Sequence, residues 1–501
     1  MLQAVLSFSR KNMILYCIIG LILFISFFTY FRNYYSPDNL FWDENYHITS
    51  AQKYLNGVFF MSDHPPLGKM FIALGEYIFH PNSRLNTNYF VTTDYIKEVP
   101  AGYSFVGVRF FPTLFAAASA ILFFFILFKI SKRLLLSFLF TSIYLFENSY
   151  IVHSRGAMLE SAHLFFIYVF ILYFLALYDR ISGAHKLGIG HYLIFGSLFG
   201  LLMSVKLNGF MCVVFFLMIA LYEAISADTR GKKINLKKSV VSIIKRGIFF
   251  GLASLFVFGA VYYLHFAIAK KPVEGRYYEA QEQYKRIIDS GKTASPAQFP
   301  YQFSQNISYI FHYEKGVPKY DYCKEGENGS LPITWPFGAK GINYRWASND
   351  GKAQYLYLQG NPVNWLLGLV GLFLSINIYT SVFVLKMKIK NRRLFTLMVT
   401  FLMFYLAYMA SMLTLERVMY LYHYFIPLSV SFFIFFLVLL YLYDEQMKRR
   451  DMTIYGVSLG IIFAVILGYL FFSPLTYYLP LSKAEFELRN WFSFWGLVSV
   501  L

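Results

Sequence analysis

The chain carries an uninterrupted apolar run near its start, Met13–Tyr30, with the sequence MILYCIIGLILFISFFTY. This run is about as long as a helix that crosses the hydrocarbon core of a bilayer, which needs roughly 20 residues. Similar runs recur, 57% of the 501 residues are hydrophobic, and the mean hydropathy is +0.48. Such a composition excludes an ordinary soluble globule and predicts an all-α polytopic membrane protein. The first run has no small-residue cleavage site, so we expect it to remain as an anchor.

Eleven apolar runs are long enough to span a bilayer, with boundaries accurate to several residues. They cover residues 12–30, 103–128, 134–151, 158–178, 189–206, 209–226, 247–269, 362–385, 394–414, 419–442 and 453–475. No internal repeat or low-complexity linker separates them. We therefore predict one membrane domain over residues 1–501.

Basic residues gather in alternate gaps between these runs. They stand at Arg10-Lys11, Lys129 to Arg133, Arg180 to Lys186, Arg230 to Arg246, Lys386 to Arg393 and Lys448 to Arg450. Because cytoplasmic loops are rich in Lys and Arg, this pattern predicts an integral membrane protein with a cytoplasmic N-terminus. The excess of 45 Lys and Arg over 27 Asp and Glu then reflects membrane topology rather than nucleic-acid binding. Three scattered cysteines offer no disulfide framework.

This topology places two long segments, residues 31–102 and 270–361, on the outer face of the membrane. Loops of that length usually carry function or form a small subdomain. The first holds two apolar stretches too short to span, 51–60 and 67–79, which we predict to be interfacial helices. We expect Asp63 to cap the second helix, with Pro65 and Pro66 in its first turn.

The unusual ionisable residues all fall on the outer side of the predicted topology. They are Asp43, Glu44, Asp63, His64, Lys69, Arg109, Arg155, Glu160, Lys206, Arg417 and His423. Ionisable groups at membrane depth are costly and usually serve a site or a pathway. Their occurrence on one side therefore predicts an extracytoplasmic active site.

The adjacent carboxylates of Asp43 and Glu44 repel each other, which raises the pKa of at least one unless a cation compensates. A carboxylate whose pKa is raised in this way can act as a general base, and the turn with His64 and Lys69 can bind an anion. A divalent metal held by Asp43, Glu44, Asp63 and His64 is the competing interpretation, although their spacing is not diagnostic of a metal.

Each further residue also has a purely structural interpretation. Arg109 or Lys206 alone could be a basic side chain that reaches water from a helix end. Arg155 and Glu160 could pair with each other across a short turn. His423 stands among three tyrosines and could belong to an interfacial aromatic belt.

The order of these residues resembles the protein O-mannosyltransferase family over residues 40 to 440. The motifs that carry the resemblance are Trp42-Asp43-Glu44, His64-Pro65-Pro66-Leu67-Gly68-Lys69, Arg109-Phe110-Phe111-Pro112, Ser154-Arg155 with Leu159-Glu160, Ser204-Val205-Lys206, Gly360-Asn361-Pro362 with Trp365, and Arg417 with Tyr422-His423-Tyr424. The second outer segment is too short for the β-trefoil MIR domain of the eukaryotic enzymes. The resemblance is therefore to a prokaryotic form in the plasma membrane, and Glu160 stands where the family often has Asp.

The resemblance implies a GT-C glycosyltransferase that moves mannose from a polyprenyl-phosphate carrier to Ser or Thr of a translocated protein. Asp43 would be the base for the acceptor hydroxyl, and Glu44 would assist or position it. A departing phosphate is best stabilised by fixed cations, for which Lys206, Arg109 and Arg417 are the candidates, with Lys206 first. A single displacement inverts the sugar, so no covalent intermediate and no cofactor is expected.

Two alternatives differ in acceptor or in class. A related GT-C transferase could place another sugar on a lipid, which would require an acceptor cavity open to the bilayer. A transporter for a lipid-linked sugar would need polar residues through the depth of its spans and pairs of broken helices, whereas this chain concentrates polar residues on one side.

Overall fold

The computed structural model describes residues 2–501 except 229–235, 274, 322, 325 and 450. The side chains of residues 2–11, 226–228 and 236–238 also lie outside the description. The side chains of the predicted cytoplasmic residues Arg10, Lys11, Arg230 and Arg450 therefore lie outside the described part of the chain. The chain forms two compact units that alternate along the sequence. One unit contains residues 34–113 and 154–319, and the other contains 1–33, 114–153 and 320–501. Each is described by itself, and the single domain over 1–501 stays a prediction.

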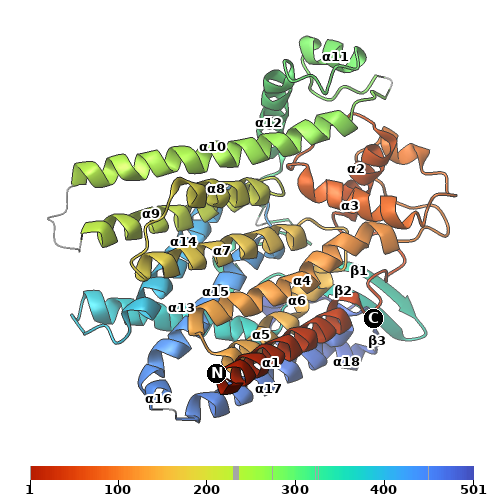
Figure 1. The fold of residues 1–501 in the computed structure, drawn as a ribbon. Helices are drawn as coiled ribbons and strands as arrows, with labels where there is room; N and C mark the ends of the chain where they lie inside the picture. Colours follow the sequence, from red (N-terminus) through yellow and green to blue (C-terminus); the bar gives the residue numbers. More distant parts are fainter. Residues whose placement is uncertain (1, 229–235, 274, 322, 325, 450) are drawn as a thin grey trace. The chain divides into compact units, whose positions relative to one another are not determined.

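Nine helical segments in the described part of the chain are long and apolar enough to cross a membrane. They are α1 (Leu2–Ser26) with the π-helical turn η1 (Phe27–Phe31), α4 (Val106–Ser131), α7 (Glu160–Ser182), η3 (Leu207–Cys212) with α9 (Val213–Asp228), α10 (Leu236–Ile268), α13 (Pro362–Phe383), α14 (Arg392–Leu413), η5 (Leu421–Tyr424) with α15 (Phe425–Leu442), and α17 (Thr453–Thr476) (Figure 1). The predicted membrane class and nine of the eleven runs are thereby confirmed.

The other two predicted spans differ from single straight helices. The run 134–151 forms α5 (Leu134–Leu145) and α6 (Asn148–Ser154), which are bent by 59° relative to each other. The buried Glu147 stands at the break and accepts hydrogen bonds from Asn364 Nδ2 at 2.9 Å and Trp365 Nε1 at 3.1 Å. These bonds satisfy a carboxylate that would otherwise be costly inside the protein. The run 189–206 forms only the 15-residue α8 (Ile189–Met203).

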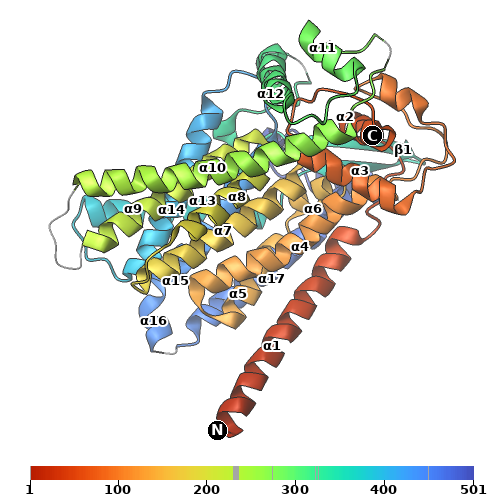
Figure 2. The same cartoon turned by 45° about the horizontal axis from the view of Figure 1, so that its top comes forward.

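The helix α8 lies beside the long helix α10 in the first unit, as both views of the chain show (Figures 1 and 2). Two glycines four residues apart, Gly196 and Gly200, make this close approach possible. A Cβ at Gly196 would overlap the backbone carbonyl of Phe250, and one at Gly200 would overlap that of Ser254. Small residues with this spacing let membrane helices approach closely.

The same unit contains most of the first predicted outer segment and residues 270–319 of the second, whereas residues 320–361 belong to the second unit. Residues 34–113 include α2 (Glu44–Asn56), α3 (Leu67–Phe79) and the 3-10 turn η2 (Asn88–Thr92), and residues 270–319 include α11 (Glu282–Asp289) and α12 (Phe299–Gly316). The two segments are joined at Phe59, whose N–H donates to the carbonyl of Lys271 at 2.7 Å. The first and second outer segments therefore fold together.

The helix α3 begins and ends at the predicted residues, whereas α2 does not. It begins at Glu44 rather than at 51 and stops before Gly57, whose left-handed φ of 66° closes the helix. The expected cap on α3 is wrong, because Pro66 occupies the N-cap position and Asp63 pairs with Lys69 instead. Tyr77 and Ile78 leave the surface of α3 apolar on one side.

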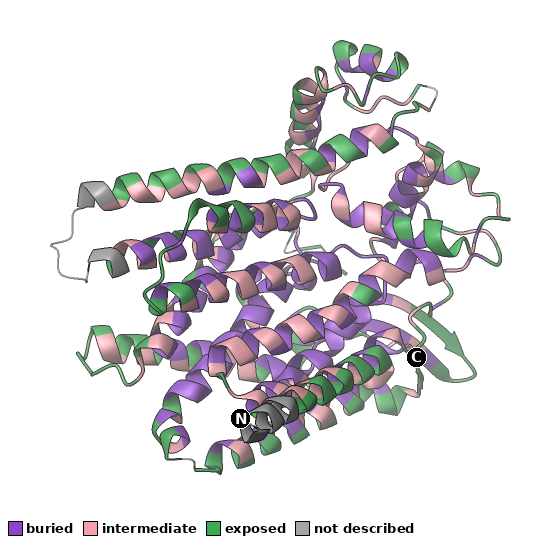
Figure 3. Cartoon of the chain, in the orientation of Figure 1, coloured by how far each residue is buried: buried purple, intermediate pink, exposed green. Residues whose placement is uncertain are grey.

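The second unit packs α15 against α13 and α14, and α15 is buried along nearly its whole length (Figure 3). It also holds a small sheet that the sequence did not predict, with β1 (Ile342–Asn349), β2 (Lys352–Leu358) and β3 (Pro480–Leu481) antiparallel in that order. The register pairs Asn349 with Lys352, and Asp350 and Gly351 form the turn with positive φ, as tight hairpins require.

Three segments expected on the cytoplasmic side meet at one end of this unit. Arg393 Nη1 donates to the carbonyl of Ile130 at 2.6 Å, and Arg133 Nη2 donates to the carbonyl of Met447 at 3.1 Å. The gaps at 129–133 and 386–393 therefore meet each other, and the first also meets Met447, which precedes the basic residue Lys448.

The α8–α10 contact gives the first testable prediction. Gly196→Ala should lower the free energy of unfolding by about 1 to 3 kcal/mol, because the added methyl forces two backbones apart. Gly190→Ala on the same helix is the matched control, since nothing lies within 4 Å of a Cβ there. Thermal unfolding in detergent measures both. Equal melting temperatures for the two variants would contradict this packing.

Candidate active site

Asp43 stands at the N-cap position of α2 and is half-buried. Its carbonyl accepts hydrogen bonds from the N–H groups of Tyr46 and His47, both at 3.0 Å. The preceding residue, Trp42, has a φ of 52°, in the left-handed region that bulky residues rarely adopt. Backbone strain of this kind persists only where the surroundings impose it, and it often marks a functional site.

Glu44, next to Asp43, is fully buried and has its carboxylate saturated with hydrogen bonds. Arg109 on α4 donates to Oε1 from Nε at 2.7 Å and to Oε2 from Nη2 at 2.9 Å. The N–H groups of Ala157 and Phe41 donate to the same carboxylate at 2.8 and 3.1 Å. The charge repulsion expected between Asp43 and Glu44 is therefore compensated by a bidentate cation.

Arg109 is equally saturated, which corrects its predicted role in binding phosphate. Besides Glu44, its guanidinium donates to three backbone carbonyls, those of Tyr35 at 2.6 Å, Pro37 at 2.8 Å and Asn39 at 2.8 Å. These bonds use all five N–H donors of an arginine. The side chain is 0% exposed and lies between the rings of Phe41 and Phe105. Arg109 therefore fixes the loop before Asp43 and has no donor left for a substrate.

The turn after Arg155 is held against the start of α2 by one peptide group. The N–H of Ala157 donates to Glu44, and its carbonyl lies 2.8 Å from Nδ1 of His47. A carbonyl can only accept, so Nδ1 of His47 carries the proton. A Cβ at Gly156 would lie 2.7 Å from the ring of Phe41, so only glycine fits in this approach.

The loop before α3 forms a second charged group beside the first. Lys69 Nζ lies 2.8 Å from Oδ1 of Asp63 and 2.7 Å from Oγ of Ser62. Burial lowers the pKa of His64 to about 4, with Lys206 and Lys69 contributing, and burial and Lys69 lower that of His47 to about 3. Both imidazoles are thus neutral at pH 7. The positive charge here comes from the two lysines.

Lys206 follows α8 and pairs with Glu160 at the start of α7, with Nζ 2.5 Å from Oε1. Glu160 therefore has Lys206 as a partner, and its predicted pairing with the buried Arg155 stays a prediction. The loop before α3 lies on the same elements, because the N–H of Leu67 donates to the carbonyl of Ser204 at 3.0 Å. Lys206 is 9% exposed, more than Arg109 or Lys69, and so is the most accessible of the three cations.

Arg417 and His423 belong to the other unit. Arg417 Nη2 lies 3.4 Å from Nε2 of His423, whose ring stacks on those of Trp335 and Tyr422. Their predicted part in the site of Asp43 stays a prediction.

The metal site considered for Asp43, Glu44, Asp63 and His64 does not fit the geometry. The Glu44 carboxylate is saturated and Asp63 is paired with Lys69. Among the residues that the structure describes, no group of three or more His, Cys, Asp or Glu side chains could hold a metal ion.

Sequence reasoning missed two residues that support the site. His47 stands three residues after Glu44, a spacing that would have placed both on one helix face had α2 been predicted to start at Glu44. The buried Lys53, one and a half turns further along α2, forms an ion pair with Asp94. Nothing in the local sequence indicates that partner.

The neutral state of His47 predicts a pH dependence of stability. Between pH 6.5 and about 3 the unfolded chain binds a proton at this imidazole that the folded chain does not. The free energy of unfolding therefore falls on acidification, by up to about 1.4 kcal/mol per pH unit for one group. His47→Gln, which can still donate to Ala157, should reduce this slope in urea titrations at pH 5 to 7. His185→Gln, on an exposed side chain, is the control. A slope unchanged in His47→Gln would contradict the assignment.

Two family models match most of the chain. The model described as dolichyl-phosphate-mannose-protein mannosyltransferase matches residues 20–269, and that of the C-terminal four-transmembrane region of protein O-mannosyltransferase matches residues 299–495. Dolichyl-phosphate-mannose-protein mannosyltransferase 5 of Candida albicans is 27% identical over 238 residues, which are 46% of this chain and 31% of that protein. Mannosyltransferase 2 of the same organism is 24% identical over 50% of this chain and 32% of that protein. The chain thus spans about a third of the length of these relatives.

Solved structures share the fold. A chain of the Saccharomyces cerevisiae protein O-mannosyltransferase Pmt1-Pmt2 complex bound to the sugar donor superposes with a TM-score of 0.78 at 15% identity, covering 96% of this chain and 92% of that one. The apo oligosaccharyltransferase of Archaeoglobus fulgidus superposes with a TM-score of 0.52 at 12% identity, covering 95% of this chain and 57% of that one. The predicted GT-C fold is thus confirmed. The two family models, which together match residues 20–269 and 299–495, show that the chain belongs to the dolichyl-phosphate-mannose-protein mannosyltransferase family.

Proposed function

We propose that this chain is an inverting glycosyltransferase that moves mannose from a polyprenyl-phosphate carrier to Ser or Thr hydroxyls of proteins. One observation supports it above the others. A half-buried carboxylate, Asp43, is fixed at the start of α2 by the saturated pair of Glu44 and Arg109. Asp63, Lys69 and Lys206 all act on the pKa of His64, and Lys206 is the most accessible cation among Arg109, Lys69 and Lys206.

In the proposed reaction, the acceptor hydroxyl oxygen attacks C1 of the mannosyl group as its proton passes to the carboxylate of Asp43. The bond from C1 to the phosphate oxygen breaks, so a β-linked donor yields an α-linked product. The polyprenyl phosphate leaves with an additional negative charge. Lys206 stabilises that charge as it develops, which is where a fixed cation has the largest effect on rate. Glu44 acts only by positioning Asp43.

We also propose the topology from the charge pattern: the N-terminus is cytoplasmic and Asp43 lies on the extracytoplasmic side of a prokaryotic plasma membrane. The meeting of the basic segments around Arg393 and Arg133 supports one cytoplasmic end for the second unit. Arg246 pairs with Glu223 at 2.9 Å, which joins the last residue of one predicted cytoplasmic gap to the end of the predicted span 209–226 in the first unit. No cofactor is required by this scheme.

Asp43→Asn tests the base. Loss of a general base should lower kcat for peptide mannosylation by about 10² to 10⁴-fold. The measurement uses the purified full chain in detergent with polyprenyl-phosphate-mannose and a Ser/Thr-rich peptide, with the product mass as readout. Asp38→Asn, an exposed carboxylate five residues earlier, is the control. Transfer unaffected by Asp43→Asn would overturn its role, and transfer by the wild type only to lipids would overturn the protein acceptor.

Lys206→Met tests the donor phosphate site. Removing the ammonium should lower kcat/KM for the donor by about 10² to 10³-fold, because the leaving phosphate loses its counter-charge. Lys206→Arg should restore part of the activity, and Lys285→Met on the surface helix α11 should change nothing. A loss of less than threefold in Lys206→Met would contradict this assignment.

A further inference from the structure

Two exposed tyrosines of the outer segments, one of them three residues after Asp43, have no part in the mechanism above. Tyr46, one turn along α2, is 41% exposed, and Tyr313, near the end of α12, is 40% exposed. They come from the two different outer segments of the same unit. Large exposed aromatic residues beside a reaction centre are typical of surfaces that receive a ligand.

The two rings share one electrostatic neighbourhood with the reactive carboxylate. Besides partial burial, the charges of Asp43 and Asp63 raise the pKa of Tyr46. Partial burial, Asp63, Tyr46 and Asp43 together raise the pKa of Tyr313 to about 12. The same two carboxylates therefore act on both tyrosines. Contacts also join the two rings: Tyr46 packs on Tyr95, the neighbouring Asp94 accepts a hydrogen bond from Tyr278, and the ring of Tyr278 packs on Tyr309 beside Tyr313.

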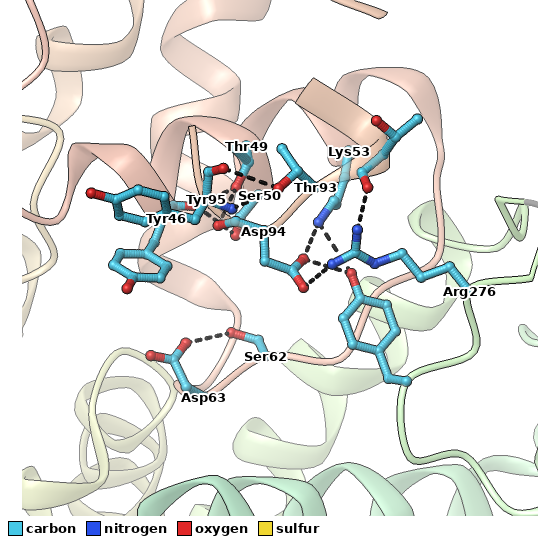
Figure 4. Close-up of polar contacts among 12 residues, drawn as sticks. Tyr46, Thr49, Ser50, Lys53, Ser62, Asp63, Thr93, Asp94, Tyr95 and Arg276 are labelled. Carbon is cyan, nitrogen blue, oxygen red and sulfur yellow. Dashed lines mark hydrogen bonds and ion pairs between the residues drawn. The ribbon is translucent and has the colours of Figure 1, made fainter. Parts of the chain in front are cut away.

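Both tyrosines are backed by other aromatic rings, so each is held in place. Tyr46 packs edge to face against Tyr95, with centroids 4.9 Å apart (Figure 4). The ring centroids of Tyr313 and Tyr309 are 6.4 Å apart. The ring of Tyr309 packs edge to face against that of Tyr278, with centroids 6.1 Å apart. Rings fixed in this way lose little conformational entropy when a ligand binds.

A partly buried polar network joins the two outer segments (Figure 4). Asp94 forms ion pairs with Lys53 of α2 and with Arg276 of the second outer segment, and it accepts a hydrogen bond of 2.7 Å from the hydroxyl of Tyr278. Tyr278 also lies 3.1 Å from Nζ of Lys53. Because Tyr278 supports Tyr309 and Tyr313, this network sets where α12 stands relative to α2.

We propose that Tyr46 and Tyr313 form the acceptor wall of the enzyme, across which an extended polypeptide lies with its Ser or Thr hydroxyl directed to Asp43. This inference rests on the proposed function, since it names the surface that the protein acceptor uses. Tyrosine suits the task because its ring packs on aliphatic side chains while its hydroxyl bonds to a peptide backbone. The carboxylates of Asp43 and Asp63 favour acceptor segments without Asp or Glu next to the hydroxyl.

Steady-state kinetics of Tyr46→Ala and Tyr313→Ala test the wall. Each change should raise KM for the peptide about tenfold, the effect of losing one well-packed contact, while KM for the donor stays within about twofold. Tyr46→Phe keeps the ring and should lose less. Tyr77→Ala on α3 is the matched control, because Tyr77 is also exposed, at 61%, and belongs to the same unit.

A crosslinking experiment measures peptide binding at the acceptor wall independently of sugar transfer. The photoreactive residue p-benzoylphenylalanine at position 46 or 313 should crosslink to a Ser/Thr-rich peptide, and at position 77 it should not. Crosslinking without transfer by the wild type would overturn the proposed function and support the wall. Transfer by the wild type, with unchanged peptide KM in both alanine variants and no crosslink at 46 or 313, would overturn the wall alone.

Discussion

The buried ion pair between Glu44 and Arg109 is the constraint on which the candidate site depends. A carboxylate and a guanidinium taken out of water are each costly, and the cost is offset only when every donor and acceptor is satisfied. Here both groups are saturated, by each other and by five backbone groups of residues 35–41 and 157. The pair therefore fixes the loop before α2 and the turn after Arg155 in one arrangement. Asp43, its strained neighbour Trp42 and the first turn of α2 follow from it.

The adjacent residues Asp43 and Glu44 thus have different roles because their environments differ. Glu44 lies inside and serves structure, whereas Asp43 stays half-buried at the helix end and can meet a hydroxyl. The cations divide in the same way. Arg109 is fully buried, and Lys69 neutralises Asp63. Lys206 pairs with Glu160 and is the most exposed of the three cations. Charge is therefore nearly balanced within the candidate site, so in the proposed reaction the donor phosphate would compete with the carboxylate of Glu160 for Lys206.

The sequence predicts the membrane helices and α3 because hydropathy and turn residues are local signals. It also singles out Asp43, Asp63, Lys69 and Lys206 as charges that are rare near a membrane. It cannot distinguish Arg109 as a structural group from Arg109 as a phosphate ligand, because that difference lies in contacts with carbonyls some seventy residues earlier in the chain. The same limit applies to the Ala157 peptide group and to the pairing of Lys53 with Asp94. Chain separation hides such partners, and only the fold brings them together.

A double-mutant cycle on the unfolding free energy of the full chain tests the central claim most directly, with Glu44→Gln, Arg109→Met and the combination. Each single change should lower the free energy of unfolding by about 3 to 5 kcal/mol, because it leaves its partner buried and unpaired. The double variant should lose much less than the sum of the two single losses. Additive losses of less than about 1 kcal/mol each, the size typical of exposed pairs, would show that this pair does not hold the site.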